Sequence, residues 1–271
     1  GAKWTARSHV KDAIGHGAAL LQPAAVESIT HRNGHVDGVL TDNGDRLEAP
    51  IVVLAAGGIA SAPILQRSGI DTAGKGIFID PLILVSGIYE GPESYAATAF
   101  NPPMCVGSWE FYESDGFMVS PLVDPWLMYI MQMGLVSPPK ALRVLKYSRV
   151  MSIMVKVKDD MAGEIYKDGS FSKPLTESDL EKLDKGERVC REVLAAAGCP
   201  PSSIVRGPVR GAHPGGGCRM GTVVDENLET DIRGLYVADA SIFPEALGTP
   251  VVGTLMAMCK RLCRHLLEQE R

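Results

Sequence analysis

The sequence lacks the patterns that most directly reveal a function. It has six cysteines and six histidines among 271 residues, but no CxxC pair and no paired spacing of metal ligands, so we expect no metal site. The formal net charge is −5 and no basic face or arm is present, which argues against nucleic acid as a partner. There is no signal peptide and no apolar run of about 18 residues, so we expect no segment to span a membrane.

Also absent is a G-x-G-x-x-G segment between a strand and a helix, the fingerprint of a dinucleotide-binding unit. The scattered cysteines predict free buried thiols, although Cys259 and Cys263 could share one face of a helix. Free thiols favour a cytoplasmic location, with peripheral attachment to a membrane as the alternative. What is present is an ordinary globular composition, 45% apolar and 22% charged, sufficient for one large or two modest domains.

One stretch, RGAHPGGGCRMG at 210–221, organises the rest of the chain. It places His213 beside a proline and three consecutive glycines, Gly215 to Gly217. Glycine leaves the backbone bare, so that a flat ligand can approach closely. A short apolar run at 235–238 predicts a buried strand that ends at Asp239. A titratable base beside a bare backbone is what a redox site with a planar cofactor would need.

The N-terminal part predicts a helix and then small strands. Residues 5–14 read as a helix, and 18–29 as two strands broken by a proline. Asn-Gly pairs at 33–34 and 43–44 are turn signals that predict a β-meander. The histidines beside the first turn, His31 and His35, are expected to be solvated.

A continuous apolar run at 51–54 predicts a strand buried on both faces. It leads into Gly57 and Gly58, and we expect Ser61 to cap a helix at 62–67. This turn could offer free N–H groups to a phosphate or a flavin edge. The alternative is a tight strand-to-helix turn with no ligand.

The middle of the chain, 77–208, predicts a substrate domain. Strand-like runs lie at 77–89 and 151–158, the latter with an alternation that predicts one solvated face. Between them, 117–150 is rich in methionine and aromatic residues and ends in basic ones. Three interpretations stay open: an apolar pocket wall, a surface for a membrane or an electron-accepting protein, or a buried helical pair. A capped amphipathic helix is expected from Thr176 to Ala197.

Two segments carry a resemblance to a known family. HPGGGCRMG at 213–221, with the strand at 235–238 and TPVVGTLMAM at 249–258, resembles the C-terminal signature of the glucose–methanol–choline (GMC) oxidoreductases. AGGIASAPILQRSGI at 56–70 is similar to that family's second signature. The family consists of flavoenzymes that oxidise alcohols with FAD. The resemblance implies an α/β (α+β) fold, in which an antiparallel substrate domain is inserted into a Rossmann-like FAD domain.

The resemblance also implies domain boundaries and site residues. It assigns 1–76 to the FAD domain, 77–208 to the substrate domain and 209–271 to the catalytic loop and the return to the FAD domain. His213 falls on the position of a catalytic histidine, and Thr249 stands where the family usually has a second His or Asn. The residues implied to contact FAD are Val26, Gly57, Gly58, Asp239, Ala240, Pro250 and Val251.

The expected activity is oxidation of a hydroxyl group on an apolar or bulky alcohol, by proton abstraction and hydride transfer to flavin N5. Two alternatives stay open: the same fold with lyase or isomerase chemistry, or a non-catalytic subunit of a larger redox complex. Because the G-x-G-x-x-G region is absent, the resemblance implies roughly a C-terminal half. The N-terminal half is expected in the same or a separate chain.

Overall fold

Two Asn-Gly turns shape the N-terminal sheet of the computed structural model, which describes residues 5–91 and 106–269. Asn33 and Gly34 both have positive φ, 52° and 76°, as a tight hairpin between two strands requires. The antiparallel order is β1 (Val26–Arg32), β2 (His35–Thr41) and β3 (Arg46–Glu48). The predicted meander is therefore confirmed, and both His31 and His35 are exposed. The strand predicted before Pro23 was wrong, because residues 18–22 are exposed and form no strand.

A parallel strand pair joins two distant parts of the chain. β4 (Val52–Leu54) pairs with β12 (Leu235–Val237), and α2 (Gly57–Arg67) follows β4 directly. Burial of β4 on both faces was a wrong prediction, because Val53 is 43% exposed while Leu54 is buried. The predicted capping role was also wrong: α2 begins at Gly57, so Ser61 lies inside the helix.

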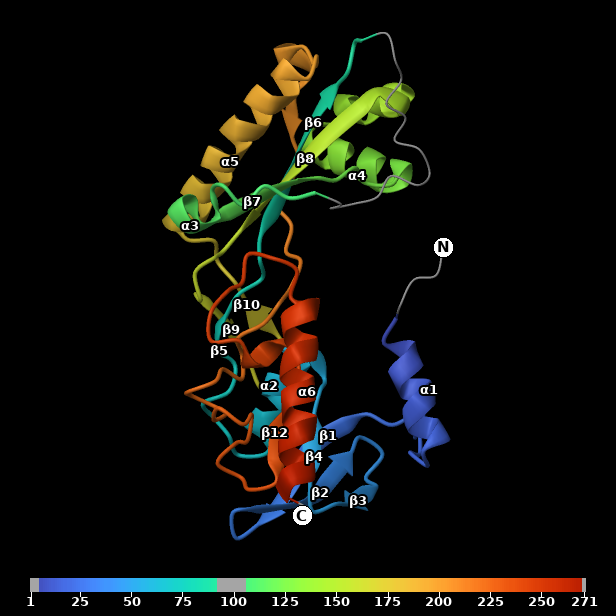
Figure 1. Ribbon diagram of the computed structural model, residues 1–271, viewed down its shortest axis with the longest axis vertical. Helices are drawn as coiled ribbons and strands as arrows, with labels where there is room; N and C mark the ends of the chain where they lie inside the picture. Colours follow the sequence, from blue (N-terminus) through green and yellow to red (C-terminus); the bar gives the residue numbers. More distant parts are fainter. Residues whose placement is uncertain (1–4, 92–105, 270–271) are drawn as a thin grey trace.

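A second, larger sheet lies at the far end of the molecule (Figure 1). It is antiparallel in the order β11-β6-β8-β7. Its strands are β6 (Leu82–Ile88), β7 (Phe117–Pro121), β8 (Val150–Val157) and β11 (Val205–Arg206). A small sheet between the two ends contains β5 (Lys75–Ile77), β9 (Gly163–Ile165) and β10 (Phe171–Ser172). The mixed fold with an antiparallel sheet in the middle of the chain agrees with the predicted fold class.

Both faces of β8 are largely covered. Its odd-numbered side chains, including Val155 and Val157, pack with α5 (Glu177–Ala196) in one core cluster. Its even-numbered side chains point to the other face, where Met154 and Lys156 are also buried. The solvated face predicted for this strand was wrong. The helix prediction for α5 is confirmed, including a capping box between Thr176 and Asp179.

The segment after β7 forms two short helices rather than a buried pair. They are α4 (Trp126–Val136) and the 3₁₀ helix η1 (Pro138–Arg149). Tyr129 and Met133 of α4 face the sheet, but many apolar side chains of the pair are exposed. These exposed side chains are Trp126, Leu127, Met128, Met131, Leu135, Leu142 and Leu145. The role of this surface toward a membrane or a protein partner stays a prediction.

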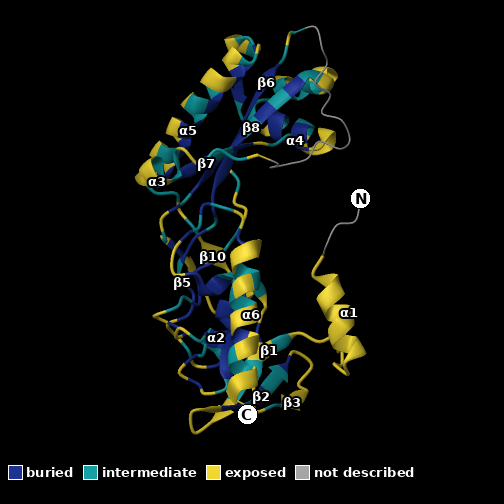
Figure 2. Ribbon diagram, viewed as in Figure 1, coloured by how far each residue is buried: buried dark blue, intermediate teal, exposed yellow. Residues whose placement is uncertain are grey.

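The remaining elements lie outside the sheets. They are α1 (Arg7–Gly15), α3 (Tyr112–Asp115), η2 (Pro201–Ser203), η3 (Ala240–Ile242) and α6 (Val252–Gln269). Figure 2 shows α1 exposed along its length. Within residues 5–91 and 106–269, no helix is long and apolar enough to cross a membrane.

Candidate active site

The loop that carries His213 lies against the segment between β5 and β6. The backbone N–H groups of Ala212 and His213 both donate to the carbonyl of Ile79, at 2.8 and 3.2 Å. Two residues away, Phe78 and Gly215 exchange backbone hydrogen bonds of 3.0 and 3.1 Å. These backbone bonds hold the imidazole at a defined place, although the loop itself has no regular secondary structure.

The glycines of this loop and of α2 are needed for close packing. A Cβ on Gly58 would lie 1.8 Å from the carbonyl oxygen of Pro214, and a Cβ on Gly215 would lie 2.4 Å from that of Ala240. No side chain fits at such separations. The two glycine-rich segments found in the sequence therefore pack directly against each other, as bare backbone on bare backbone.

Asp239 connects the end of β12 to the start of α2. Its Oδ2 accepts hydrogen bonds from the Gly57 N–H (2.9 Å) and from the Ser61 hydroxyl, and its Oδ1 accepts from the Ser241 N–H (2.8 Å). The side chain is buried, and all three donors are neutral groups. Asp239 thus stabilises the junction at the carboxyl ends of the two parallel strands, where doubly wound sheets bind cofactors.

His213 contacts two buried charged groups through one ring nitrogen. Its Nδ1 contacts Lys156 Nζ and lies 3.3 Å from Asp80 Oδ2, and these last two atoms are 3.1 Å apart. The side chains of Lys156 and Asp80 are 1% and 0% exposed, whereas that of His213 is 26% exposed. Burial lowers the pKa of Lys156, and Asp80 opposes this shift. Within the described residues, Nε2 of His213 has no hydrogen-bond partner, so this nitrogen is available to a substrate.

The loop with Thr249 reaches the same cluster. Asp80 Oδ1 accepts a 3.0 Å hydrogen bond from the Gly248 N–H, while the Tyr112 hydroxyl donates to the Leu247 carbonyl at 2.6 Å. Asp80 therefore bridges the His213 loop and the Thr249 loop. Thr249 is half-buried, and the chain then continues through Pro250 and Val251 into α6.

Most of the predicted site residues come together in this way. Gly57 bonds to Asp239, Gly58 packs on the residue after His213, and Gly216 donates to the Ala240 carbonyl. Val251 is buried in the core cluster against which Val26 packs from β1. The roles of these residues toward a cofactor stay predictions.

Sequence reasoning missed Asp80 and Lys156. Asp80 has a positive φ of 47°, an uncommon backbone conformation for a residue other than glycine. Lys156 lies among apolar strand residues, which was a usable signal, because a lysine at an inward strand position needs a buried partner.

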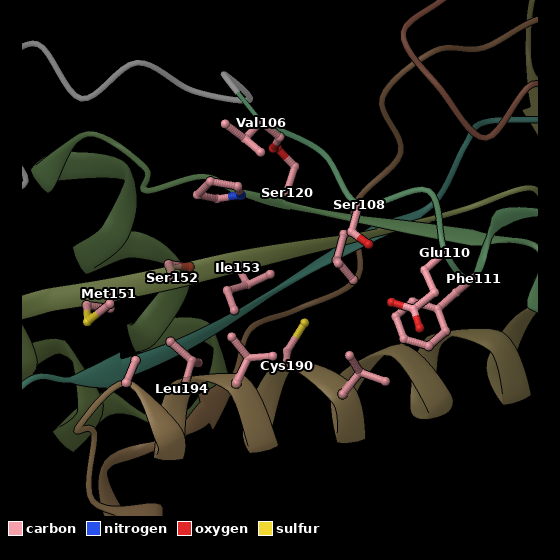
Figure 3. Close-up of a pocket in the computed structure, with 15 residues that line it drawn as sticks. Val106, Ser108, Glu110, Phe111, Ser120, Met151, Ser152, Ile153, Cys190 and Leu194 are labelled. Atoms are coloured by element: carbon pink, nitrogen blue, oxygen red, sulfur yellow. The ribbon is translucent and has the colours of Figure 1, made fainter.

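An apolar cavity of about 480 Å³ lies elsewhere, between α5 and the strands β7 and β8 (Figure 3). Its lining includes Ile153, Cys190 and Leu194, but none of the predicted catalytic or cofactor residues. Ile153 lies on the face of the sheet that α5 covers, and Cys190 and Leu194 belong to α5 itself, whereas Lys156 points to the other face of the sheet. The cavity is therefore separate from the site at His213.

The end of β4 presents bare backbone of the kind that a flavin nucleotide requires. Ala55 and Ala56, after β4, are exposed and have small side chains, and Gly57 next to them has a φ of 97°. An open strand end with bare backbone suits a ligand with a flat ring and a polar tail. The residues present therefore fit FAD.

Comparison with known proteins establishes the family. Two family models described as GMC oxidoreductase match residues 1–82 and 170–259. The chain therefore belongs to the GMC oxidoreductase family, as the motifs indicated. Members of this family are generally flavoproteins that bind FAD.

Individual relatives agree with this assignment. The chain is 30% identical over 268 residues to an uncharacterized protein of Methanocaldococcus jannaschii. The alignment covers 98% of this chain and 65% of that protein. It is 22% identical to a long-chain-alcohol oxidase of Arabidopsis thaliana, over 94% of this chain and 43% of the oxidase.

Solved structures share the fold. Pyridoxine 4-oxidase from Mesorbium loti superposes with a TM-score of 0.62 and 17% sequence identity. The superposition covers 89% of this chain and 57% of the oxidase. An FAD-dependent oxidoreductase from Chaetomium thermophilum superposes over 98% of this chain and 64% of its own length, with a TM-score of 0.58 and 15% identity. The chain thus has the α/β fold of GMC flavoproteins, and it spans less than two thirds of the length of these relatives.

Proposed function

We propose that this chain is part of an FAD-dependent oxidoreductase that oxidises a hydroxyl (CH–OH) group, with His213 as the base that removes the hydroxyl proton. The observation that carries the proposal is the orientation of the imidazole. Its Nδ1 faces the buried Asp80 and Lys156, so that Nε2 is the nitrogen left for a substrate. Histidine suits this task because its ordinary pKa lies near neutrality.

Bound FAD would supply the hydride acceptor, flavin N5. The backbone of Gly57 and Gly58 would hold its polar part at the open end of β4, together with Asp239 and Ala240. Pro250 and Val251 would lie against the ring, and Val26 would contact the adenine. The proposal includes an N-terminal half with the missing dinucleotide fingerprint, in the same or a separate chain. The proposal that FAD binds here is supported by the family's flavin chemistry and by the bare backbone of the glycine-rich segments.

The proposed substrate is an apolar or bulky alcohol. Leu82 and Leu84 of β6 pair with Lys156 and Met154 of β8, so these four side chains share one face of the sheet. The two leucines and Met154 form an apolar cluster, with Leu122 packed against it, that extends from the charged cluster. The names of two relatives, a long-chain-alcohol oxidase and a pyridoxine oxidase, also denote oxidation of hydroxyl-bearing molecules. Thr249 would contribute a hydrogen bond to the substrate hydroxyl rather than a second base.

The test is anaerobic flavin reduction by alcohols of increasing chain length, measured by absorbance on the full-length protein. His213→Ala should slow reduction by about 10²–10⁴-fold. His35→Ala, an exposed histidine on β2, is the matched control and should have no effect.

Each other outcome has a separate meaning. Unchanged reduction in His213→Ala would remove the base assignment. Bound flavin that no alcohol reduces would favour lyase or isomerase chemistry, and absence of flavin from the full-length protein would favour a non-catalytic subunit.

A further inference from the structure

A buried lysine in contact with the imidazole is not explained by the proposed reaction. Lys156 is in the penultimate position of β8, and its side chain is 1% exposed. Burial of an ammonium group is costly unless it is paired. The groups that face it come from three loops: Asp80 after β5, Asp159 after β8, and His213 before β12.

A second buried lysine provides a comparison. The side chain of Lys173 is 2% exposed, and its ammonium group lies 3.1 Å from Asp159 and 3.5 Å from Asp179, whose side chains are both fully buried. Lys173 thus has two carboxylates and no imidazole among these contacts. Lys156 has one carboxylate within ion-pair distance, and its second contact is a ring nitrogen. A lysine needed only to balance the charge of Asp80 would not require that second contact.

The contact at Nδ1 determines which nitrogen of His213 carries the proton. A charged Lys156 donates to Nδ1, which must then be unprotonated, so a neutral imidazole carries its proton on Nε2. In that state Nε2 cannot accept a proton from a substrate. A neutral Lys156 has a lone pair instead, so Nδ1 carries the proton and donates it inward, which leaves Nε2 free as a base.

We propose that Lys156 is the final proton acceptor and acts through His213: as Nε2 takes the proton of the substrate hydroxyl, Nδ1 passes its own proton to the neutral amine of Lys156. The substrate O–H and the Nδ1–H bonds break, and the Nε2–H and Nζ–H bonds form. The imidazole stays neutral, and the new ammonium group pairs with Asp80 Oδ2, 3.1 Å away. This step rests on the proposed role of His213 as the base, and bound FAD would supply the acceptor for the electron pair of the C–H bond.

The electrostatics of the cluster support both states of the lysine. Burial lowers the pKa of Lys156, which favours the neutral amine before the reaction, whereas Asp80 and, more weakly, Asp159 favour the ammonium afterwards. Lysine is suited to such a role because its pKa shifts readily when it is buried. Asp80 and Lys156 are therefore positioning residues for His213, since neither reaches the free Nε2.

The first test does not depend on turnover. Full-length holoenzyme with ¹⁵N-labelled histidine is titrated without substrate, and His213 is assigned by difference from His213→Asn. We expect the proton of the neutral imidazole to move from Nε2 to Nδ1 as the pH rises and Lys156 deprotonates. In Lys156→Met, Nδ1 should keep the proton throughout, because only Asp80 remains beside it. A wild-type tautomer that does not change with pH would overturn the proposal.

The second test measures flavin reduction by an alcohol over the same pH range. Lys156→Met and Lys156→Arg should both lower the limiting rate at least about tenfold, because neither side chain accepts a proton near neutrality. The Kd of the substrate should be unchanged in both. Lys173→Met, the matched buried lysine, should lower stability while the pH profile keeps its shape. An arginine variant with the wild-type rate and pH profile would show that Lys156 only balances the charge of Asp80.

The two tests separate failure of this inference from failure of the proposed function. If no alcohol reduces the wild-type flavin but the tautomer changes with pH as expected, the coupling of Lys156 to His213 holds and the assigned reaction is wrong. If alcohols reduce the flavin and the tautomer is constant, the reaction stands and the role of Lys156 is wrong.

Discussion

Two buried aspartates flank the candidate site, and their partners differ in kind. Asp239 accepts hydrogen bonds from two backbone N–H groups and a hydroxyl, all neutral. Asp80 accepts one backbone N–H but otherwise faces a lysine and an imidazole. Both side chains are almost inaccessible, at 5% and 0% exposure.

This difference in partners assigns a structural role to Asp239 and a role in proton transfer to the groups around Asp80. Neutral donors cannot exchange a proton with a carboxylate at ordinary pH, so Asp239 can only hold three segments in place. Partners that titrate can shift protons among themselves, so the groups around Asp80 can change charge while the backbone stays still. The comparison predicts that changes at Asp239 act on stability, whereas changes at Asp80 act mainly on rate and its pH dependence.

The largest expected effect is that of Asp239→Ala. It leaves the Gly57 N–H, the Ser61 hydroxyl and the Ser241 N–H without acceptors in a buried place, and each unsatisfied group costs about 1–3 kcal/mol. We expect a total loss of about 3 kcal/mol or more in the free energy of unfolding, with loss of bound flavin. Urea unfolding of the full-length protein measures it. A normal stability with only a slower reaction would contradict the structural role of Asp239.

A smaller loss is expected at the adjacent glycines, which form a matched pair. Gly58→Ala places a Cβ 1.8 Å from the Pro214 carbonyl oxygen, so the His213 loop must move. Overpacking of this kind costs about 1–3 kcal/mol, and flavin reduction should slow as well. Gly57→Ala meets no atom within 4 Å but has a φ of 97°, so it should cost about 1–2 kcal/mol through backbone strain alone. Urea unfolding and flavin reduction of both variants check the contrast, and equal effects on rate would contradict it.

The Asp239 side of the site could be predicted from the sequence, because local patterns determine it. A strand that ends in Asp and a Gly-Gly pair before a helix are visible in the chain, and the turns at 33–34 and 43–44 formed where predicted. Such features depend on conformational preferences of a few adjacent residues. The predicted helix start was still wrong: α2 begins at Gly57, and the Ser61 hydroxyl inside the helix bonds to the distant Asp239.

The Asp80 side could not be predicted, because it depends on long-range strand pairing. Asp80, Lys156 and His213 are separated by more than 50 residues each, and β6–β8 pairing brings the first two together. The alternation in β8 predicted a solvated face because no sequence signal shows what covers the second face of a sheet. The helix α4 was ambiguous for the same reason, since its apolar residues point both inward and outward.

Asp80→Asn tests the contrast between Asp80 and Asp239, and its expected effect on flavin reduction is intermediate in size. The amide oxygen can still accept the Gly248 N–H, so the loop stays in place, but the negative charge is lost. Because Asp80 raises the pKa of Lys156, its removal should lower that pKa further and shift the pH dependence of flavin reduction to lower pH. The limiting rate should fall about tenfold, or about 1.4 kcal/mol, because the ammonium formed has lost its partner. An unshifted pH profile would contradict the coupling.

The smallest expected effect is on stability as a function of pH. The pKa of Lys156 is lowered from 10.5 in the folded protein. Between the lowered value and 10.5 the unfolded chain therefore binds one more proton than the folded one, so this lysine makes stability rise with pH. The slope cannot exceed about 1.4 kcal/mol per pH unit for one proton. Urea unfolding of wild type and Lys156→Met at intervals from neutral pH to about 10 isolates the effect as a difference.

The stability of wild type is compared with that of Lys156→Met because buried thiols change stability with pH in the direction opposite to Lys156. Burial raises the pKa of Cys190 and of Cys218 from 9.0 to about 12. Above pH 9 their unfolded forms lose protons that the folded forms keep, so stability falls there in both variants alike and cancels from the comparison. We expect the stability of wild type relative to Lys156→Met to increase steadily with pH. A stability difference between the two proteins that does not change with pH would mean that Lys156 stays charged in the folded protein. Asp80 would then differ from Asp239 only in the charge of its partners, and no proton would move among the groups around it.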